Sequence, residues 1–197
     1  MKTLAFVLAA ALLAGCTGIR TIESDVSSFG DWPAARQPGT YAFDRLPSQQ
    51  AIAEQTAKVE DAARAALEKA GFKPAAEGAQ PDVLVQVAAR VNRADAGVWD
   101  DPLWWRGGFG YWRYSPWPGP YWSLSARYDR LRYEREVALL LRDRESGKPL
   151  FEARASNESS SGLSREQLGA MFEAAMMDFP KLGPNPRRVV VQLPPSS

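Results

Sequence analysis

The chain lacks histidine altogether and contains a single cysteine in 197 residues. Without histidine it cannot assemble a Ser-His-Asp triad or a Cys-His pair, so these two forms of nucleophilic catalysis are excluded. The commonest zinc ligand is missing as well, and one cysteine cannot supply a conventional zinc site. No disulfide can form within the chain, so its stability has to come from a packed core, which a hydrophobic content of 45% makes feasible.

The chain also lacks an excess of charge of either sign. Its 24 lysines and arginines and 23 aspartates and glutamates leave a formal net charge of +1 at pH 7. Because general nucleic-acid binding depends on a surplus of cationic side chains, we expect no nucleic-acid partner. The sequence has neither a phosphate-binding P-loop nor the Ser-x-x-Lys pair of penicillin-binding proteins. Together with the missing histidine, these gaps predict a protein that is not an enzyme and that binds no cofactor.

The N-terminal apolar run, from Leu4 to Leu13, is too short to cross a bilayer permanently, which takes roughly 20 apolar residues. It follows the cationic Lys2 and ends in Leu13-Ala14-Gly15-Cys16. That order resembles a bacterial lipobox, in which the signal peptide, here residues 1–15, is removed and the cysteine is lipidated. The alternative is an ordinary secretory peptide cut after Ala14 or Gly15, which would leave a free thiol at Cys16.

The lipobox resemblance implies a diacylglyceryl group on the Cys16 sulfur and an acyl group, such as palmitate, on its amine. Two or more acyl chains hold a protein stably on a membrane, at about 0.8 kcal/mol per buried methylene. Thr17 follows the cysteine, in place of the aspartate that favours inner-membrane retention. We therefore expect Cys16 to anchor the chain in membrane lipid of the bacterial outer membrane, with the protein facing the periplasm.

Hydrophobic periodicity divides the rest of the chain into strands and helices. Residues 16–39 form either a lipidated tether or an edge strand, and residues 194–197 form a tail. Residues 40–193 are predicted to be a single domain in the order β-α-β-β-β-α-β, an α+β fold with a mixed sheet and two helices packed on one face. Ser164 and Gln167 form a candidate capping box for the second helix. The predicted strands are residues 40–43, 82–91, 133–142, 150–156 and 187–193, and the predicted helices are residues 48–70 and 164–179.

A long insertion at residues 94–123, which we call the aromatic segment, interrupts this pattern. It holds six of the seven tryptophans, interleaved with glycines and prolines that prevent a regular helix. Three interpretations remain open: its aromatic side chains cover the edge or open face of the sheet, they bind a protein partner or the lipid interface, or they stack on sugars of a glycan. The candidate binding residues are Trp99, Trp104, Trp105, Arg106, Trp112, Arg113, Trp117 and Trp122.

Acidic residues beside these tryptophans raise two further hypotheses. Asp100 and Asp101 suggest a glycosidase, since these enzymes use two carboxylates. Neighbouring residues rarely face each other across a substrate, however, so we predict no catalytic residue here. Asp95 with the same two aspartates lacks the spacing of a calcium-binding loop, and we predict no metal site.

Alternating charges follow the aromatic segment. Four arginines interleave with Asp129, Glu134 and Glu136. We interpret them as a solvated, ion-paired strand edge rather than an anion site, because such charges protect an edge from aggregation. The arginines are Arg127, Arg130, Arg132 and Arg135.

Several short motifs occur in a characteristic order along the chain. They are the lipobox at Cys16, Thr40-Tyr41-Ala42-Phe43, the strand beginning Pro81-Asp82-Val83-Leu84-Val85, the hairpin with Leu141-Arg142-Asp143, Ser146-Gly147-Lys148 and Leu150-Phe151, and the helix end Asp178-Phe179-Pro180. In this order they resemble a family of bacterial lipoproteins, the domain of unknown function family numbered 4136. The resemblance implies an envelope location and no activity or catalytic residue. The chain departs from the family at Glu134-Arg135-Glu136-Val137, where Gly-Thr-Leu is more usual, and at Phe151-Glu152, where Trp-Arg is common.

The sequence thus predicts a non-catalytic outer-membrane lipoprotein used for envelope binding or assembly, with an envelope protein or peptidoglycan as its partner. The alternative is a peptidoglycan- or glycan-binding, carbohydrate-active protein that uses the aromatic segment.

Overall fold

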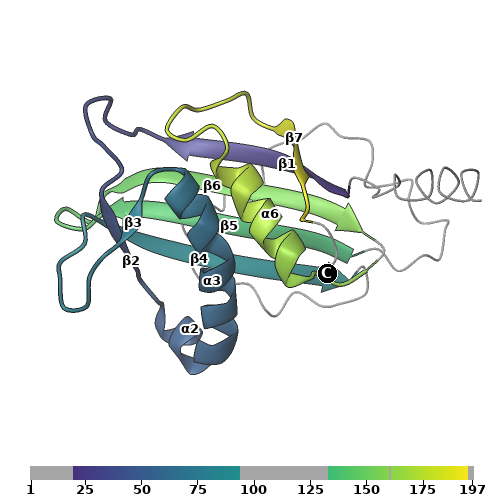
Figure 1. Ribbon diagram of the computed structural model, residues 1–197, viewed down its shortest axis with the longest axis horizontal. Coiled ribbons are helices and arrows are strands. Elements are labelled where there is room, and N and C mark those ends of the chain that lie inside the picture. Colours follow the sequence, from purple (N-terminus) through teal and green to yellow (C-terminus); the bar gives the residue numbers. More distant parts are fainter. Residues whose placement is uncertain (1–19, 94–132, 160, 195–197) are drawn as a thin grey trace, which may run out of the picture.

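The structure, a computed structural model, describes residues 20–93, 133–159 and 161–194. Over these residues the chain forms a mixed seven-stranded sheet and three helices, an α+β fold (Figure 1). The strands lie across the sheet in the order β3-β2-β4-β5-β6-β1-β7. The strands are β1 (Thr21–Gly30), β2 (Thr40–Phe43), β3 (Lys73–Pro74), β4 (Val83–Arg93), β5 (Tyr133–Asp143), β6 (Pro149–Ser159) and β7 (Arg187–Gln192), and the helices are α2 (Pro47–Ala51), α3 (Ala53–Lys69) and α6 (Arg165–Met176).

The three longest strands form the antiparallel centre of the sheet. β4, β5 and β6 have 11 residues each. Tyr133, at the start of β5, pairs with Arg93 at the end of β4 and with Ser159 at the end of β6. β1 pairs antiparallel with both β6 and β7, whereas β2 pairs parallel with β4 and β3. The sheet is therefore mixed, with its parallel pairs confined to the β2 side.

Helices α3 and α6 lie against the same face of the sheet (Figure 1). Successive side chains of a strand point to opposite faces, so alternate residues of the central strands, such as Val85, Leu139 and Phe151, enter one core with these helices. Alanines such as Ala63 and Ala66 on α3 allow close approach to the sheet. The opposite side, against which no described helix packs, is called the helix-free face below. None of the described helices is long and apolar enough to cross a membrane.

The helix predicted over residues 48–70 is divided in two. Ile52, with φ −119° and ψ 43°, lies outside the helical region and separates α2 from α3. Gln49 Nε2 on α2 donates to the Val87 carbonyl of β4 at 2.8 Å, and Thr56 Oγ1 donates to the Gln49 carbonyl at 2.9 Å. The first bond ties α2 to the sheet and the second ties α2 to α3, and a hydrophobic pattern reveals neither.

Residues 21–30 form β1, so a strand and not a free tether occupies this part of residues 16–39. β1 lies between β6 and β7, inside the sheet and not at its edge. Its helix-facing positions alternate Ile22 and Val26 with Ser24 and Ser28, and both serines are 1% exposed. Buried serines weaken the apolar alternation, which is why the sequence left this strand undecided.

Candidate functional site

The binding and lipidation residues predicted from the sequence lie outside the described residues. This applies to Cys16 and to the candidate binding residues from Trp99 to Trp122. The described residues nearest to these segments in the sequence are Arg20 before β1, Arg93 at the end of β4, and Tyr133 at the start of β5.

The start of β1, the end of β4 and the start of β5 lie at one end of the sheet, which we call the Arg20 end (Figure 1). Arg93 pairs with Tyr133, and Tyr133 pairs with Ser159. β1 runs antiparallel to β6, so β1 begins beside the residues where β6 ends. The Arg20 carbonyl also accepts a hydrogen bond from the Leu193 backbone N–H at 2.7 Å. The chain therefore enters β1 and departs for the aromatic segment at the same end of the sheet.

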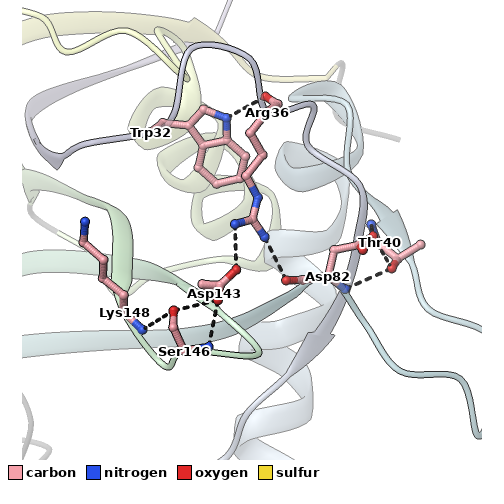
Figure 2. Close-up of polar contacts among 7 residues, drawn as sticks. All are labelled: Trp32, Arg36, Thr40, Asp82, Asp143, Ser146 and Lys148. Atoms are coloured by element: carbon pink, nitrogen blue, oxygen red, sulfur yellow. Dashed lines mark hydrogen bonds and ion pairs between the residues drawn. The ribbon is translucent and has the colours of Figure 1, made fainter.

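A polar cluster at the opposite end of the sheet, which we call the clasp, joins three segments far apart in the sequence (Figure 2). Arg36, in the loop after β1, donates through Nη1 to Asp143 Oδ2 at 2.6 Å and through Nη2 to the Asp82 carbonyl at 3.0 Å. Asp143 Oδ1 accepts from the backbone N–H and hydroxyl of Ser146 at 2.8 and 2.6 Å. Asp82 Oδ2 accepts from the backbone N–H and hydroxyl of Thr40, both at 2.7 Å. The clasp thus ties the loop after β1 to the start of β4 and to the β5–β6 turn.

Hydrogen bonds keep both carboxylates of the clasp ionised. Bonds from Ser146, and then the bond from Arg36, hold the pKa of Asp143 well below its usual range. The pKa of Asp82 is lowered mainly by the backbone and side-chain bonds from Thr40. Carboxylates that stay ionised throughout the neutral range exchange no proton there, so the clasp suits a structural role and not acid–base chemistry.

Next to the clasp, Trp32 packs against a group of phenylalanines. Its ring centroid lies 5.7 Å from that of Phe72 and 4.8 Å from that of Phe179, and Phe151 lies 5.1 Å from Phe179. Trp32 Nε1 also donates to the Arg36 carbonyl at 2.9 Å, and the Arg36 guanidinium lies 5.4 Å from the tryptophan ring centre. Such aromatic pairs contribute about 0.5–1.5 kcal/mol each beyond their burial. The cluster therefore holds the loop that carries Arg36 against the core.

The clasp and its aromatic neighbours bring together residues from separate motifs of the family resemblance. Asp82, Asp143 and Ser146 belong to the clasp, and Phe151 and Phe179 to the adjacent cluster. Arg36 was missed from the sequence, because its carboxylate partner lies 107 positions away and no local pattern marks the pair.

A second group of charges, which we call the charge ladder, crosses the helix-free face. Arg90 on β4 is in register with Glu136 on β5, and Arg90 Nη2 lies 2.7 Å from Glu136 Oε2. On β6, Arg154 Nε lies 2.8 Å from Glu152 Oε1, and these side chains share a face because they are two residues apart. Side-chain exposure ranges from 5% for Glu152 to 25% for Arg90. The ladder is thus a set of largely buried ion pairs across three adjacent strands.

Burial raises the pKa of Glu152 to about 7, against the opposing attraction of Arg154. Burial also raises the pKa of Glu136, with Arg90 and Arg154 opposing it. A buried carboxyl that titrates near neutrality is a candidate for acid–base chemistry. Its hydrogen-bond partner is a guanidinium, however, which keeps its proton. The ladder can hold a proton at Glu152, and none of its four side chains is a neutral nucleophile.

The interpretation of the alternating charges as a solvated strand edge is wrong for residues 134–136. They lie in β5, which is paired on both sides by β4 and β6. Arg135 is 1% exposed and donates to the carbonyls of Ser161 and Gly162 and to the Asn157 side chain. Burial lowers the pKa of Arg135. The other arginines of that stretch, Arg127, Arg130 and Arg132, and Asp129 lie outside the described residues.

Pockets and metal-ligating side chains contribute little to the candidate site. A shallow groove of about 290 Å³ between α3 and α6 is lined mainly by small apolar residues such as Ala66 and Gly169. Over the described ranges, no three His, Cys, Asp or Glu side chains come together in a way that could hold a metal ion. The clasp and the charge ladder are therefore the best-defined polar arrangements in the part of the chain that the structure describes.

The described residues form an α+β sheet domain in which ion pairs hold the clasp and the charge ladder together. The chain belongs to the family described as "Domain of unknown function (DUF4136)", whose model matches residues 25–181. No curated protein matches the chain.

Two kinds of solved structure resemble the fold. The crystal structure of a PDZ domain protein from Parabacteroides distasonis is similar over 93% of this chain, with a TM-score of 0.54 and 13% identity. The chain spans 42% of that protein's length, and at this identity the likeness concerns the fold alone. The PelC dodecamer from Paraburkholderia phytofirmans matches with a TM-score of 0.41 and 11% identity, over 78% of this chain and 94% of that one.

Proposed function

We propose that the chain is a lipid-anchored envelope protein, attached through acylated Cys16 to the outer membrane and facing the periplasm. In this proposal it is a non-catalytic module that uses the aromatic segment to bind an envelope partner. The lipobox resemblance of Leu13-Ala14-Gly15-Cys16 supports the anchor, as does the resemblance of the chain's ordered motifs to a family of bacterial lipoproteins. One structural observation carries the rest: the described residues nearest in sequence to Cys16 and to the aromatic segment lie at the same end of the sheet.

The short stretch of chain between Cys16 and β1 limits how far this end of the sheet can lie from the membrane. Thr21, the first residue of β1, is the fifth residue after Cys16. A fully extended chain of that length spans at most about 18 Å. Arg93, directly before the aromatic segment, and Tyr133, ten residues after it, lie at the end of the sheet where β1 begins. An acylated Cys16 would therefore hold the attachment points of the aromatic segment close to the bilayer.

The chemistry of the described residues supports binding over catalysis. The clasp carboxylates stay ionised at neutral pH, and Glu152 is bonded to a guanidinium that holds its own proton. The aromatic segment, in contrast, is rich in tryptophan, whose apolar ring and polar N–H suit a protein surface near the membrane interface.

Deleting residues 97–122 tests the binding role. We expect the deleted protein to fold and to remain in the membrane fraction, but to lose the partner that crosslinks to the intact chain in whole cells. Identical crosslinked species from the two forms would remove the aromatic segment as the binding surface.

Incubation with purified sacculi tests the glycan alternative. Release of muropeptides by the protein would overturn the non-catalytic proposal. Co-sedimentation without release, lost on deletion of residues 97–122, would identify the partner as peptidoglycan.

A further inference from the structure

We infer that the domain stands on the membrane by the Arg20 end of the sheet, so that this end contacts the lipid headgroups and the clasp points away into the periplasm. The partner of this surface is the bilayer itself. The inference rests on the proposed anchoring through Cys16, and it adds an orientation that anchoring alone does not impose.

The first step is that the sheet begins only a few residues after Cys16. Arg20 is fixed to the sheet by the Leu193 N–H, which donates to the Arg20 carbonyl at 2.7 Å. Thr21 pairs with Gln192, so β1 is held from its first residue. The Arg20 guanidinium also lies 4.0 Å from the Glu166 carboxylate in the first turn of α6. Only residues 17–19 therefore separate Cys16 from a residue that the sheet holds in place.

The second step compares the stretch of chain from Cys16 to Thr21, called the tether in this subsection, with the length of the sheet. The tether spans at most about 18 Å when extended, whereas an 11-residue strand such as β5 is about 35 Å long. The clasp, at the far end of β5, is thus beyond the reach of the tether while the strands stand upright. The clasp could approach the lipid only if the domain lay on its side.

The third step is that the described surface offers no apolar side on which to lie. The five exposed large hydrophobic residues of the described chain come from four different parts of the fold. Single exposed apolar side chains are ordinary and do not make a membrane-binding face. These residues are Ile52 between α2 and α3, Val91 on β4, Met177 and Leu182 after α6, and Val190 on β7.

The Arg20 end itself suits a headgroup layer. Arg20 and Arg165 are exposed cations on long apolar stems, which can rest on a lipid surface with their charge in the headgroups. The side chains of Arg20 and Glu166 are both 46% exposed. An ion pair this exposed contributes little to stability, so it leaves the guanidinium available to lipid phosphates. Arg20, which is the fourth residue after Cys16, lies at this end with Arg165 and with the strand ends that lead toward the aromatic segment, so an upright orientation brings all of them to the lipid.

The test uses the chemistry of the anchor. If the Cys16 sulfur carries lipid, an introduced cysteine is the only free thiol in the chain. Gln192→Cys places a fluorophore at the Arg20 end, Glu145→Cys places one in the β5–β6 turn beside the clasp, and Arg188→Cys places one between them. All three positions are exposed. The full acylated variants are reconstituted into phosphatidylcholine and phosphatidylglycerol vesicles that contain a lipid with a nitroxide on its headgroup.

We expect strong quenching at Gln192→Cys, weaker quenching at Arg188→Cys and almost none at Glu145→Cys, because nitroxide quenching acts over distances short relative to the sheet. Equal quenching at the three positions, or stronger quenching at Glu145→Cys, would overturn the upright orientation. Circular dichroism identifies any variant that fails to fold, and the remaining pair still decides the order.

Flotation and intact mass separate this inference from the proposed anchor. A chain that carries lipid and floats with vesicles but shows no gradient of quenching contradicts the orientation alone. A chain without lipid on Cys16 contradicts both proposals.

Discussion

Arg36 Nη1 and Asp143 Oδ2 lie 2.6 Å apart, although the two residues are 107 positions apart in the sequence. The side chains are 25% and 19% exposed, so the pair is mostly shielded from water. Arg36 also donates to the Asp82 carbonyl, which places one guanidinium between the loop after β1, the start of β4 and the β5–β6 turn. At this end of the sheet one cation therefore joins three segments that are distant in the sequence.

Replacing Arg36 with alanine should lower the urea midpoint of unfolding at pH 7. The change removes the donor to Asp143 Oδ2 and leaves the Asp82 carbonyl with only the 3.3 Å bond from the Arg144 backbone N–H, and the loss of a partner by a partly shielded polar group is costly. Arg36→Lys keeps the charge but loses the planar geometry that lets one guanidinium donate two bonds. Its urea midpoint should therefore lie between those of the natural chain and of Arg36→Ala. Arg144→Ala, an exposed arginine of the same turn, is the matched control. Equal midpoints for Arg36→Ala and Arg144→Ala would contradict the role of the clasp.

The clasp should also make the protein sensitive to acid. The folded pKa values of Asp82 and Asp143 lie below the ordinary 3.8. A lowered folded pKa gives stability that is present above the unfolded value and is lost as the pH falls through the folded value. Urea midpoints should therefore decline below about pH 4, and Asp143→Asn should flatten the decline relative to the natural chain. A decline of the same steepness in the variant would assign the acid sensitivity to other carboxylates.

Gly39 should be far less tolerant of alanine than Gly78, although their backbones are alike. Their φ angles are +78° and +76°. A Cβ on Gly39 would meet Asp82 Oδ2 at 2.7 Å, whereas a Cβ on Gly78 has nothing within 4 Å. Both variants carry the backbone strain of about 1 kcal/mol or more, and Gly39→Ala adds the displacement of a clasp carboxylate. Equal losses in urea midpoint would mean that Asp82 moves aside without cost.

Glu152 should produce the opposite pH dependence in a separate window. Its folded pKa of about 7 lies above the ordinary 4.5, so the folded state prefers the protonated form. This contribution to stability is complete below pH 4.5 and is lost as the pH rises through about 7. Glu152→Gln keeps an acceptor for Arg154 and removes the buried charge. We expect it to be more stable than the natural chain at pH 8.5, by up to about 3 kcal/mol, and similar to it at pH 5.

The measurement is the urea midpoint of both proteins across this pH range. A glutamine variant that is less stable than the natural chain at pH 8.5 would show that the Arg154–Glu152 ion pair is worth more than the burial of its charge costs.

The sequence predicted those parts of the fold that depend on local pattern. The α+β class was predicted, and the capping box of Ser164 and Gln167 is confirmed at the start of α6. β1 was left undecided because Ser24 and Ser28 occupy buried positions that periodicity expects to be apolar. The split of the predicted helix at Ile52 depends on bonds from Gln49 to β4, which no sequence window contains.

Polar residues were harder to place because their roles depend on neighbouring strands. Charges in β5 resembled a solvated edge, yet strands pair on both sides of it and Arg135 is buried. The ladder had a local signal, since Glu152 and Arg154 alternate with the core residue Ala153 and so had to share the opposite face. The clasp had none, because its cation and carboxylates come from three distant segments.

The central claim is that Cys16 anchors this domain in the outer membrane. The most direct measurement is the intact mass of the N-terminal peptide of the protein extracted from the outer-membrane fraction, with Cys16→Ser as the control. We predict a peptide that begins at Cys16 and carries a diacylglyceryl group and an acyl group, and a Cys16→Ser protein that leaves the membrane fraction. A peptide with an unmodified Cys16, or a Cys16→Ser protein that stays in the membrane, would contradict the account.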